Sequence, residues 1–132
     1  MSKILHIEDE SDIQEVARIA LEDVGGFSVV VVGSGKEGLA AARNALPDII
    51  LLDVMMPGMD GPTTLKELRK CPETASIPVI FMTANAQRHE IQGYMDLGAL
   101  GVITKPFDPM TLAEEVNALW KGDSRRARNP QD

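Results

Sequence analysis

The chain has 132 residues, of which 44% are hydrophobic and 25% charged, and this size favours one compact domain over several. Its 13 Lys and Arg residues against 20 Asp and Glu residues give a formal net charge of −7. This charge argues against electrostatic binding of nucleic-acid phosphates over the whole chain. The apolar runs are far shorter than the roughly 20 residues that a membrane-spanning helix needs, and the N-terminus lacks the apolar stretch of a secretory signal. A single cysteine, Cys71, excludes an intrachain disulfide and a cysteine-based zinc module. We therefore expect a cytoplasmic protein with no direct nucleic-acid partner and no membrane partner.

Five short apolar runs alternate with longer stretches of helical periodicity, which is the pattern of βαβ units around a parallel sheet. The third run, Ile49–Leu52, is apolar throughout, as expected for a strand that helices cover on both faces. The pattern predicts an α/β fold of three layers with the sheet in the middle. The predicted strands are Lys3–Ile7, Phe27–Val32, Ile49–Leu52, Pro78–Met82 and Gly101–Thr104.

The first predicted helix has clear sequence signals at both ends. Ser11 is its predicted N-cap and Gln14 stands at the third helical position, so that the two form a capping box. Gly25-Gly26 is predicted to end the helix, because glycine tolerates the left-handed conformation found at many helix ends. Between these ends apolar residues recur at helical spacing: Ile13, Val16, Ala17, Ala20, Leu21 and Val24.

The two predicted helices nearest the C-terminus differ in expected stability. The helix around residues 87–97 contains Gly93, which costs about 1 kcal/mol relative to alanine, so we expect this helix to shift most easily. The last helix is predicted to begin with Asp108 as N-cap and Pro109 at the first helical position. Its apolar stripe places Trp120 in the core rather than at a cofactor.

The folded domain is expected to span residues 1–122. Residues 123–132 contain one apolar residue and three arginines, so we predict a disordered basic tail or the start of a linker. The sequence leaves open whether the domain is a stand-alone regulator or part of a longer protein.

Polar side chains follow four of the five predicted strands. In a parallel α/β sheet the carboxyl ends of the strands meet at one edge, and ligands bind there at the point where the strand order reverses. We therefore expect carboxylates, a hydroxyl and an ammonium group to gather in one site, although they are far apart in the sequence. These residues are Glu8, Asp9, Asp53, Thr83 and Lys105.

The chemistry of this group points to a metal ion and a phosphoryl group. Two carboxylates about 4 Å apart repel each other by about 4 kcal/mol at an effective dielectric constant of 20, so the cluster requires a cation. Its donors are oxygens, which favours Mg²⁺. A metal ion, the Lys105 ammonium group and the Thr83 hydroxyl would together bind phosphoryl oxygens. Asp53, directly after an apolar run, is the candidate nucleophile.

Four motifs coincide with these strand ends. They are ILHIEDE at residues 4–10, LLDVMMPGMDG at 51–61, MTA at 82–84, and Gly98-Ala99 leading to Lys105-Pro106-Phe107. In this order and spacing they resemble the receiver domain of bacterial two-component response regulators, across about residues 2–121.

This resemblance implies a flavodoxin-like (βα)5 fold, with a parallel five-stranded sheet of order 2-1-3-4-5. It implies that Asp53 is the phosphoacceptor, that Thr83 holds a phosphoryl oxygen and that Lys105 pairs with the phosphoryl group. A cis peptide bond between Lys105 and Pro106 is a further expectation. The resemblance also implies that Mg²⁺ is ligated by Asp9 and Asp53, by the backbone carbonyl of Met55, and by Glu8 through water.

The implied partners follow from the same resemblance. The phosphodonor would be a phosphohistidine on a sensor histidine kinase or on a histidine phosphotransfer protein of a phosphorelay. The phosphorylated state would regulate a downstream protein target by direct contact, and a homodimer through the last two helices is a further expectation. The protein would catalyse its own phosphorylation and dephosphorylation only, and would not be an enzyme for an independent substrate.

Two positions depart from the usual pattern of the family. Position 8 is Glu where many receivers have Asp, which is expected to alter the metal geometry more than metal binding. Position 102 is Val where receivers usually have Tyr or Phe, whose rotamer follows the Thr hydroxyl, so signalling through that aromatic side chain is in doubt. Motion of the helix that contains Gly93 is an alternative way to couple Thr83 to the surface.

Other functions have partial sequence signals. Residues 33–38 read GSGKEG, a literal G-x-G-x-x-G motif, so an NAD-binding regulatory module is the alternative interpretation. In a 2-1-3-4-5 sheet this motif would lie at an edge, away from the switch point. A haloacid-type phosphatase would need a second Asp at position 55, and the acids after the first strand would repel the FMN phosphate of a flavodoxin. His6 and His89 are interpreted as structural.

Overall fold

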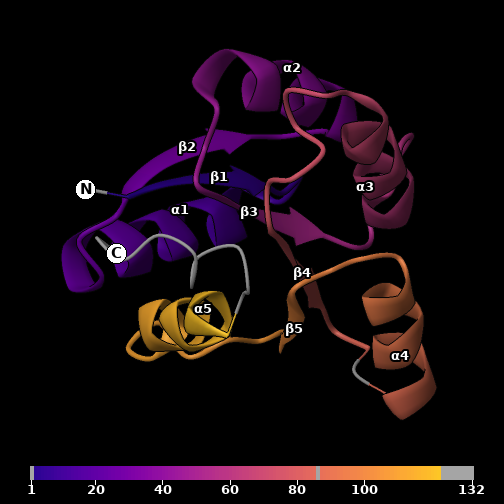
Figure 1. Ribbon diagram of the computed structural model, residues 1–132. Helices are drawn as coiled ribbons and strands as arrows, with labels where there is room; N and C mark the ends of the chain where they lie inside the picture. Colours follow the sequence, from indigo (N-terminus) through magenta and orange to yellow (C-terminus); the bar gives the residue numbers. More distant parts are fainter. Residues whose placement is uncertain (1, 86, 123–132) are drawn as a thin grey trace.

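The computed structural model describes residues 2–85 and 87–122 and places the sheet at the centre of the domain (Figure 1). Its five strands are parallel and lie in the order β2-β1-β3-β4-β5, which confirms the predicted fold class and strand order. The order reverses between β1 and β3, so the ends of these two strands mark the predicted ligand position. The strands are β1 Lys3–Ile7, β2 Ser28–Val32, β3 Ile49–Asp53, β4 Val79–Thr83 and β5 Gly101–Thr104.

The first and last strands have the predicted bounds, and the others differ by one residue. Asp53 and Thr83 are the last residues of β3 and β4 rather than the first residues after them. The backbone pairing explains this difference, because Asp53 is in register with Met82 and Thr83 with Thr104. Both side chains are thereby held by the sheet and not by a loop.

Helices cover both faces of the sheet. Figure 1 shows α1 and α5 below the sheet, and α2 and α3 above it. Alternate strand residues point to opposite faces, so Ile4 packs with residues of α1 and α5, and Leu5 packs with residues of α2 and α3. The helices are α1 Ser11–Ile19, η1 Ala20–Val24, α2 Gly35–Ala45, α3 Gly61–Lys70, α4 Arg88–Asp96 and α5 Leu112–Lys121.

The core confirms the predicted position of the single tryptophan. Trp120 is buried in the cluster between the sheet and the α1–α5 layer, next to Leu112 and Val116. None of the helices in the described ranges, 2–85 and 87–122, is long and apolar enough to cross a membrane.

Two predicted helix starts were wrong. Glu10, not Ser11, is the N-cap of α1, and Gln14 donates its side-chain amide to the backbone oxygen of Glu8 instead of completing a capping box. The last helix begins at Leu112, because Asp108 accepts a hydrogen bond from the Met110 N–H at 2.9 Å and stabilises a turn before the helix. In both places a nearby backbone group competes for the side chain that was expected to cap the helix.

Two of the three glycines of the G-x-G-x-x-G motif, Gly35 and Gly38, are explained by close packing. The motif follows β2, which is an edge strand and lies away from the point where the strand order reverses. This position argues against the alternative interpretation, an NAD-binding module. A Cβ atom on Gly35 would clash with the Thr64 hydroxyl, and one on Gly38 would clash with the Ile7 side chain. The two glycines therefore let α2 approach α3 and β1, and no dinucleotide is needed to account for them.

Gly61 and Gly93 offer a matched pair of alanine substitutions. A Cβ atom on Gly61 would lie 2.5 Å from the backbone oxygen of Asp53, whereas nothing lies within 4 Å of one on Gly93. We expect Gly61→Ala to lower the free energy of unfolding by about 1–3 kcal/mol. Gly93→Ala should raise it by up to about 1 kcal/mol. Urea unfolding measures both, and a loss of stability in Gly93→Ala would show that the α4 backbone is constrained in a way that these contacts do not explain.

Candidate functional site

The structure brings the five predicted site residues to the carboxyl edge of the sheet. Glu8 and Asp9 directly follow β1, Asp53 and Thr83 end β3 and β4, and Lys105 directly follows β5. Lys105 connects residues that are far apart in the sequence, because its N–H donates to the backbone oxygen of Thr83 at 2.8 Å. The peptide bond between Lys105 and Pro106 is cis, as expected.

The side chain of Lys105 pairs with two buried carboxylates. Its Nζ atom lies 2.8 Å from Oε1 of Glu8 and 3.0 Å from Oδ1 of Asp53. Glu8 has no solvent-exposed surface and Asp53 is 3% exposed. Although burial of the ammonium group acts in the opposite direction, its hydrogen bonds to Glu8 and Asp53 raise the pKa of Lys105, which is therefore charged at neutral pH.

Glu8 is held in an environment that disfavours its charge. Burial raises the pKa of Glu8 to about 7, and the negative charge of Asp53 acts in the same direction. The hydrogen bond from Lys105 and the hydrogen bond from the Glu10 N–H oppose this shift. One ammonium group thus compensates the two buried carboxylates only in part.

Glu8, Asp9 and Asp53 form a cluster that fits a divalent cation. Each offers one carboxylate oxygen, and these three oxygens lie within 4.8 Å of one another. Three carboxylates against the single charge of Lys105 leave a formal charge of 1 − 3 = −2, so the charge of a divalent ion would balance the group. Asp9 is exposed, which gives an ion an approach from solvent. The donors are all oxygens, which favours Mg²⁺ over softer metals.

Met55 lies on the loop after β3, two residues beyond Asp53, and its side chain is 76% exposed. Its backbone carbonyl, the expected third protein ligand, lies on the loop that directly follows Asp53. The neighbouring Met56 is buried in the core, so the two methionines do not share one apolar surface patch.

Thr83 lies beside this cluster and has a partner that the sequence did not indicate. Its side chain is buried, and its hydroxyl oxygen accepts a hydrogen bond from the Asn85 N–H at 3.0 Å. The ring of Tyr94, on α4, packs on Phe81, two residues before Thr83 on the same strand, with ring centroids 5.1 Å apart. No motif singled out Tyr94; helical spacing alone could have placed it on the inward face of α4.

The two histidines, His6 and His89, differ in burial. His6 is fully buried in β1, and neither ring nitrogen has a hydrogen-bond partner among the described residues. Burial, helped by the positive charge of Lys105, lowers the pKa of His6 to about 4, so the ring is neutral at pH 7. His89 is exposed on α4, with Nε2 3.2 Å from the Glu90 carboxylate, so it is not part of the core.

The position at which the resemblance placed an aromatic switch is occupied by a half-buried Val102. Val102 is in register with Phe81 of β4 and packs in the cluster that includes Tyr94. The aromatic rings in this part of the structure are therefore those of Phe81 on β4 and of Tyr94 on α4, which pack on each other.

Comparisons with known proteins agree with this geometry. The family model described as "Response regulator receiver domain" matches residues 4–117. The transcriptional regulatory protein CseB of Streptomyces avermitilis is 37% identical over 118 residues, 89% of this chain and 48% of that protein. Protein PilH of Pseudomonas aeruginosa is 35% identical over 122 residues, 92% of this chain and 100% of that protein. The chain thus spans about half the length of CseB and the full length of PilH.

Solved structures give the same result. The structure of Vibrio cholerae chemotaxis protein CheY4 has a TM-score of 0.84 and 31% sequence identity, over 90% of this chain and 98% of that chain. The receiver domain of the Francisella response regulator 1452 has a TM-score of 0.82 and 31% identity, over 92% of this chain and 98% of that chain. The matched sequence, the strand order and the acidic cluster beside Lys105 agree, and the chain belongs to the response regulator receiver domain family.

Proposed function

We propose that this domain accepts a phosphoryl group on Asp53 in a Mg²⁺-dependent reaction and regulates a partner protein in its phosphorylated state. The observation that carries the proposal is the contact of Lys105 Nζ with Asp53 at 3.0 Å, next to a cluster of three carboxylates. Asp53, the proposed nucleophile, is held in place at the end of β3, and the exposed Asp9 leaves the site open toward solvent.

The proposed transfer is balanced in atoms and electrons. An Asp53 carboxylate oxygen attacks the phosphorus of a phosphohistidine, and a new O–P bond forms as the P–N bond breaks. The imidazole nitrogen of the donor keeps the electron pair of the broken bond, and Asp53 becomes an acyl phosphate. Attack of water on the phosphorus later releases inorganic phosphate and restores the carboxylate. The domain thus modifies only itself and turns over no independent substrate.

Each residue of the site has a part in this reaction. Lys105, which pairs with Asp53 before transfer, is placed to bind a phosphoryl oxygen afterwards. The Thr83 hydroxyl, whose oxygen accepts from the Asn85 N–H, is placed to donate its proton to a second oxygen. Glu8, Asp9, Asp53 and the Met55 carbonyl would hold Mg²⁺, which supplies positive charge for the phosphoryl oxygens when it is bound.

The phosphodonor in this proposal is a sensor histidine kinase or a histidine phosphotransfer protein. An apolar groove of about 360 Å³ opens beside the site, between α1 and the segment that follows β5. It includes Ile13, Val16 and Phe107 and also Lys105, so a donor protein bound in it would lie next to Asp53. A cytoplasmic location and a homodimer through α4 and α5 remain predictions.

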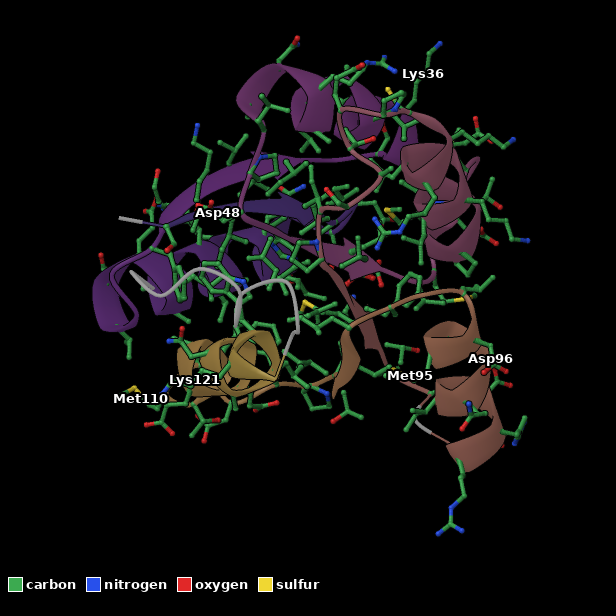
Figure 2. The ribbon with its side chains drawn as sticks, in the orientation of Figure 1. Lys36, Asp48, Met95, Asp96, Met110 and Lys121 are labelled. Carbon is green, nitrogen blue, oxygen red and sulfur yellow. The ribbon has the colours of Figure 1, made fainter. Side chains whose placement is uncertain are left out.

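Acetyl phosphate tests the phosphoacceptor directly. Incubation with Mg²⁺ should add the mass of one phosphoryl group to the protein, measured by intact mass spectrometry, and chelation of Mg²⁺ should prevent the addition. Asp53→Asn should abolish it, because the amide lacks the nucleophilic oxygen. Asp96→Asn, on the outer surface of α4 (Figure 2), is the matched control and should be phosphorylated like the wild type. A mass gain that persists in Asp53→Asn would place the acceptor elsewhere.

Lys105→Met tests the charge balance of the site. Loss of the ammonium group leaves Glu8 and Asp53 without their partner, and we expect a loss of about 3 kcal/mol in the free energy of unfolding without metal. Added Mg²⁺ should stabilise this variant more than the wild type, because the more negative site binds the ion more tightly. Lys36→Met, at an exposed lysine on α2 (Figure 2), is the control. Equal losses in the two variants would argue against a special role for Lys105.

Amide hydrogen exchange tests whether the signal reaches α4. We expect beryllofluoride, which mimics the phosphoryl group, to change the protection of residues 88–102 in the presence of Mg²⁺, because Tyr94 of α4 packs on Phe81, in the strand that ends at Thr83. The amides of α2, on the opposite edge of the sheet, provide an internal reference. Unchanged protection of α4 would mean that phosphorylation is signalled by another surface.

A further inference from the structure

The loop between β1 and α1 carries two of the three carboxylates of the site. Glu8 and Asp9 are neighbours in the chain, and Glu8 is buried while Asp9 is exposed. Each nevertheless offers an oxygen to the same cluster, together with Asp53. A peptide unit is rigid and turns as a whole. The orientation of the peptide plane between Glu8 and Asp9 therefore decides whether both carboxylates can face one cation.

Gln14, near the start of α1, is bonded to that peptide plane. Its Nε2 atom donates to the backbone oxygen of Glu8 at 2.5 Å, and this oxygen belongs to the peptide unit that joins Glu8 to Asp9. Within residues 2–85 and 87–122 no other donor reaches this oxygen. Gln14 is half-buried, and its own backbone N–H donates to the Glu10 oxygen at 3.0 Å. The helix thus holds Gln14, and Gln14 holds the peptide between the two acids.

The other hydrogen bonds of the loop fix Glu8 but not the peptide that follows it. The Glu8 N–H donates to the Val32 oxygen of β2 at 3.0 Å, and its carboxylate accepts from Lys105 and from the Glu10 N–H. In the part of the chain that the structure describes, the Asp9 carboxylate accepts no hydrogen bond. Its position therefore depends on the backbone that leads to it.

The amide of Gln14 supplies this hydrogen bond without adding a charge. A lysine or an arginine at the same place could also donate, but its positive charge would offset the excess negative charge that favours a cation. An uncharged donor orients the backbone and leaves the formal charge of −2 on the carboxylates and Lys105 unchanged.

We propose that Gln14 is a positioning residue for the metal site, which holds the Glu8–Asp9 peptide in the orientation that lets both carboxylates face one Mg²⁺ ion. The proposal rests on the Mg²⁺-dependent function proposed above. Gln14 acts through the backbone and touches neither the ion nor the phosphoryl group. Groups that orient metal ligands in this way set metal affinity. Gln14 should therefore determine how much Mg²⁺ the domain needs, and not the rate of phosphorylation once the ion is bound.

Gln14→Met tests this role, because it keeps the length of the side chain and removes the donor. We expect the variant to bind Mg²⁺ about fivefold more weakly than the wild type, the factor typical of one hydrogen bond. A Mg²⁺ titration followed by amide NMR spectra measures this affinity. At saturating Mg²⁺ the rate of phosphorylation by acetyl phosphate should equal that of the wild type.

Gln92→Met is the matched control. Gln92 is an exposed glutamine on α4, and its Nε2 atom donates to Asp96 at 2.8 Å. The same substitution there removes a side-chain hydrogen bond of the same donor, away from the carboxylates, and should leave Mg²⁺ affinity unchanged. Gln14→Asn keeps the amide but shortens the side chain by one methylene group, so it should weaken Mg²⁺ binding as Gln14→Met does.

A double-mutant cycle with Asp9 separates this role from a general effect on folding. In the Asp9→Ala background, which lacks the carboxylate that Gln14 is proposed to position, Gln14→Met should leave Mg²⁺ affinity unchanged. Wild-type affinity in Gln14→Met overturns the proposal, and so does an equal loss in the Asp9→Ala background. Lower stability of Gln14→Met with unchanged Mg²⁺ affinity would show that Gln14 serves only the fold. If the wild type itself binds no Mg²⁺, the proposed function fails, which is a different result.

Discussion

The ammonium group of Lys105 lies between two carboxylates that the fold has removed from solvent, Glu8 and Asp53. Without this cation the two buried charges would repel each other in a medium that screens them poorly. With Lys105 present, the carboxylates of Glu8, Asp53 and the exposed Asp9 still give the site a formal charge of −2. The same excess of negative charge that makes the site costly in isolation makes it suited to a divalent cation.

The helices that surround this site differ in how deeply they are packed against the sheet. On one face α1 and α5 bury a dense apolar cluster, which includes Trp120 and supports the strands that carry the charges. On the other face α2 and α3 contribute to a second buried cluster, whereas α4 buries none of its residues and packs Tyr94 on Phe81 of β4. Thr83 stands between the rigid charge cluster and the weakly attached helix. A domain built in this way can keep its chemistry fixed while one surface moves.

The sequence predicted the sheet well because the information is local. Apolar runs such as Ile49–Leu52 identify buried strands. The residues directly after each run lie at the same edge of the sheet, independently of where the helices begin and end. Helix starts were less predictable. Gln14 and Asp108 were expected to take part in capping, but in the folded chain the Glu8 backbone oxygen and the Met110 N–H offer their side chains other hydrogen bonds. Capping depends on which partner is near, and the tertiary structure sets that distance.

By itself the sequence determined the class of fold and the five polar residues at the carboxyl edge, because strand periodicity and strand-end position suffice for these. The strand order followed from the resemblance to the receiver family. Only the tertiary structure decided that Glu8 is buried while its neighbour Asp9 is exposed, since burial depends on what packs above each side chain. Only the tertiary structure placed Tyr94 of α4 against Phe81 of β4. That contact joins two elements whose relative position is set by packing across the whole face of the sheet, and no short sequence pattern encodes it.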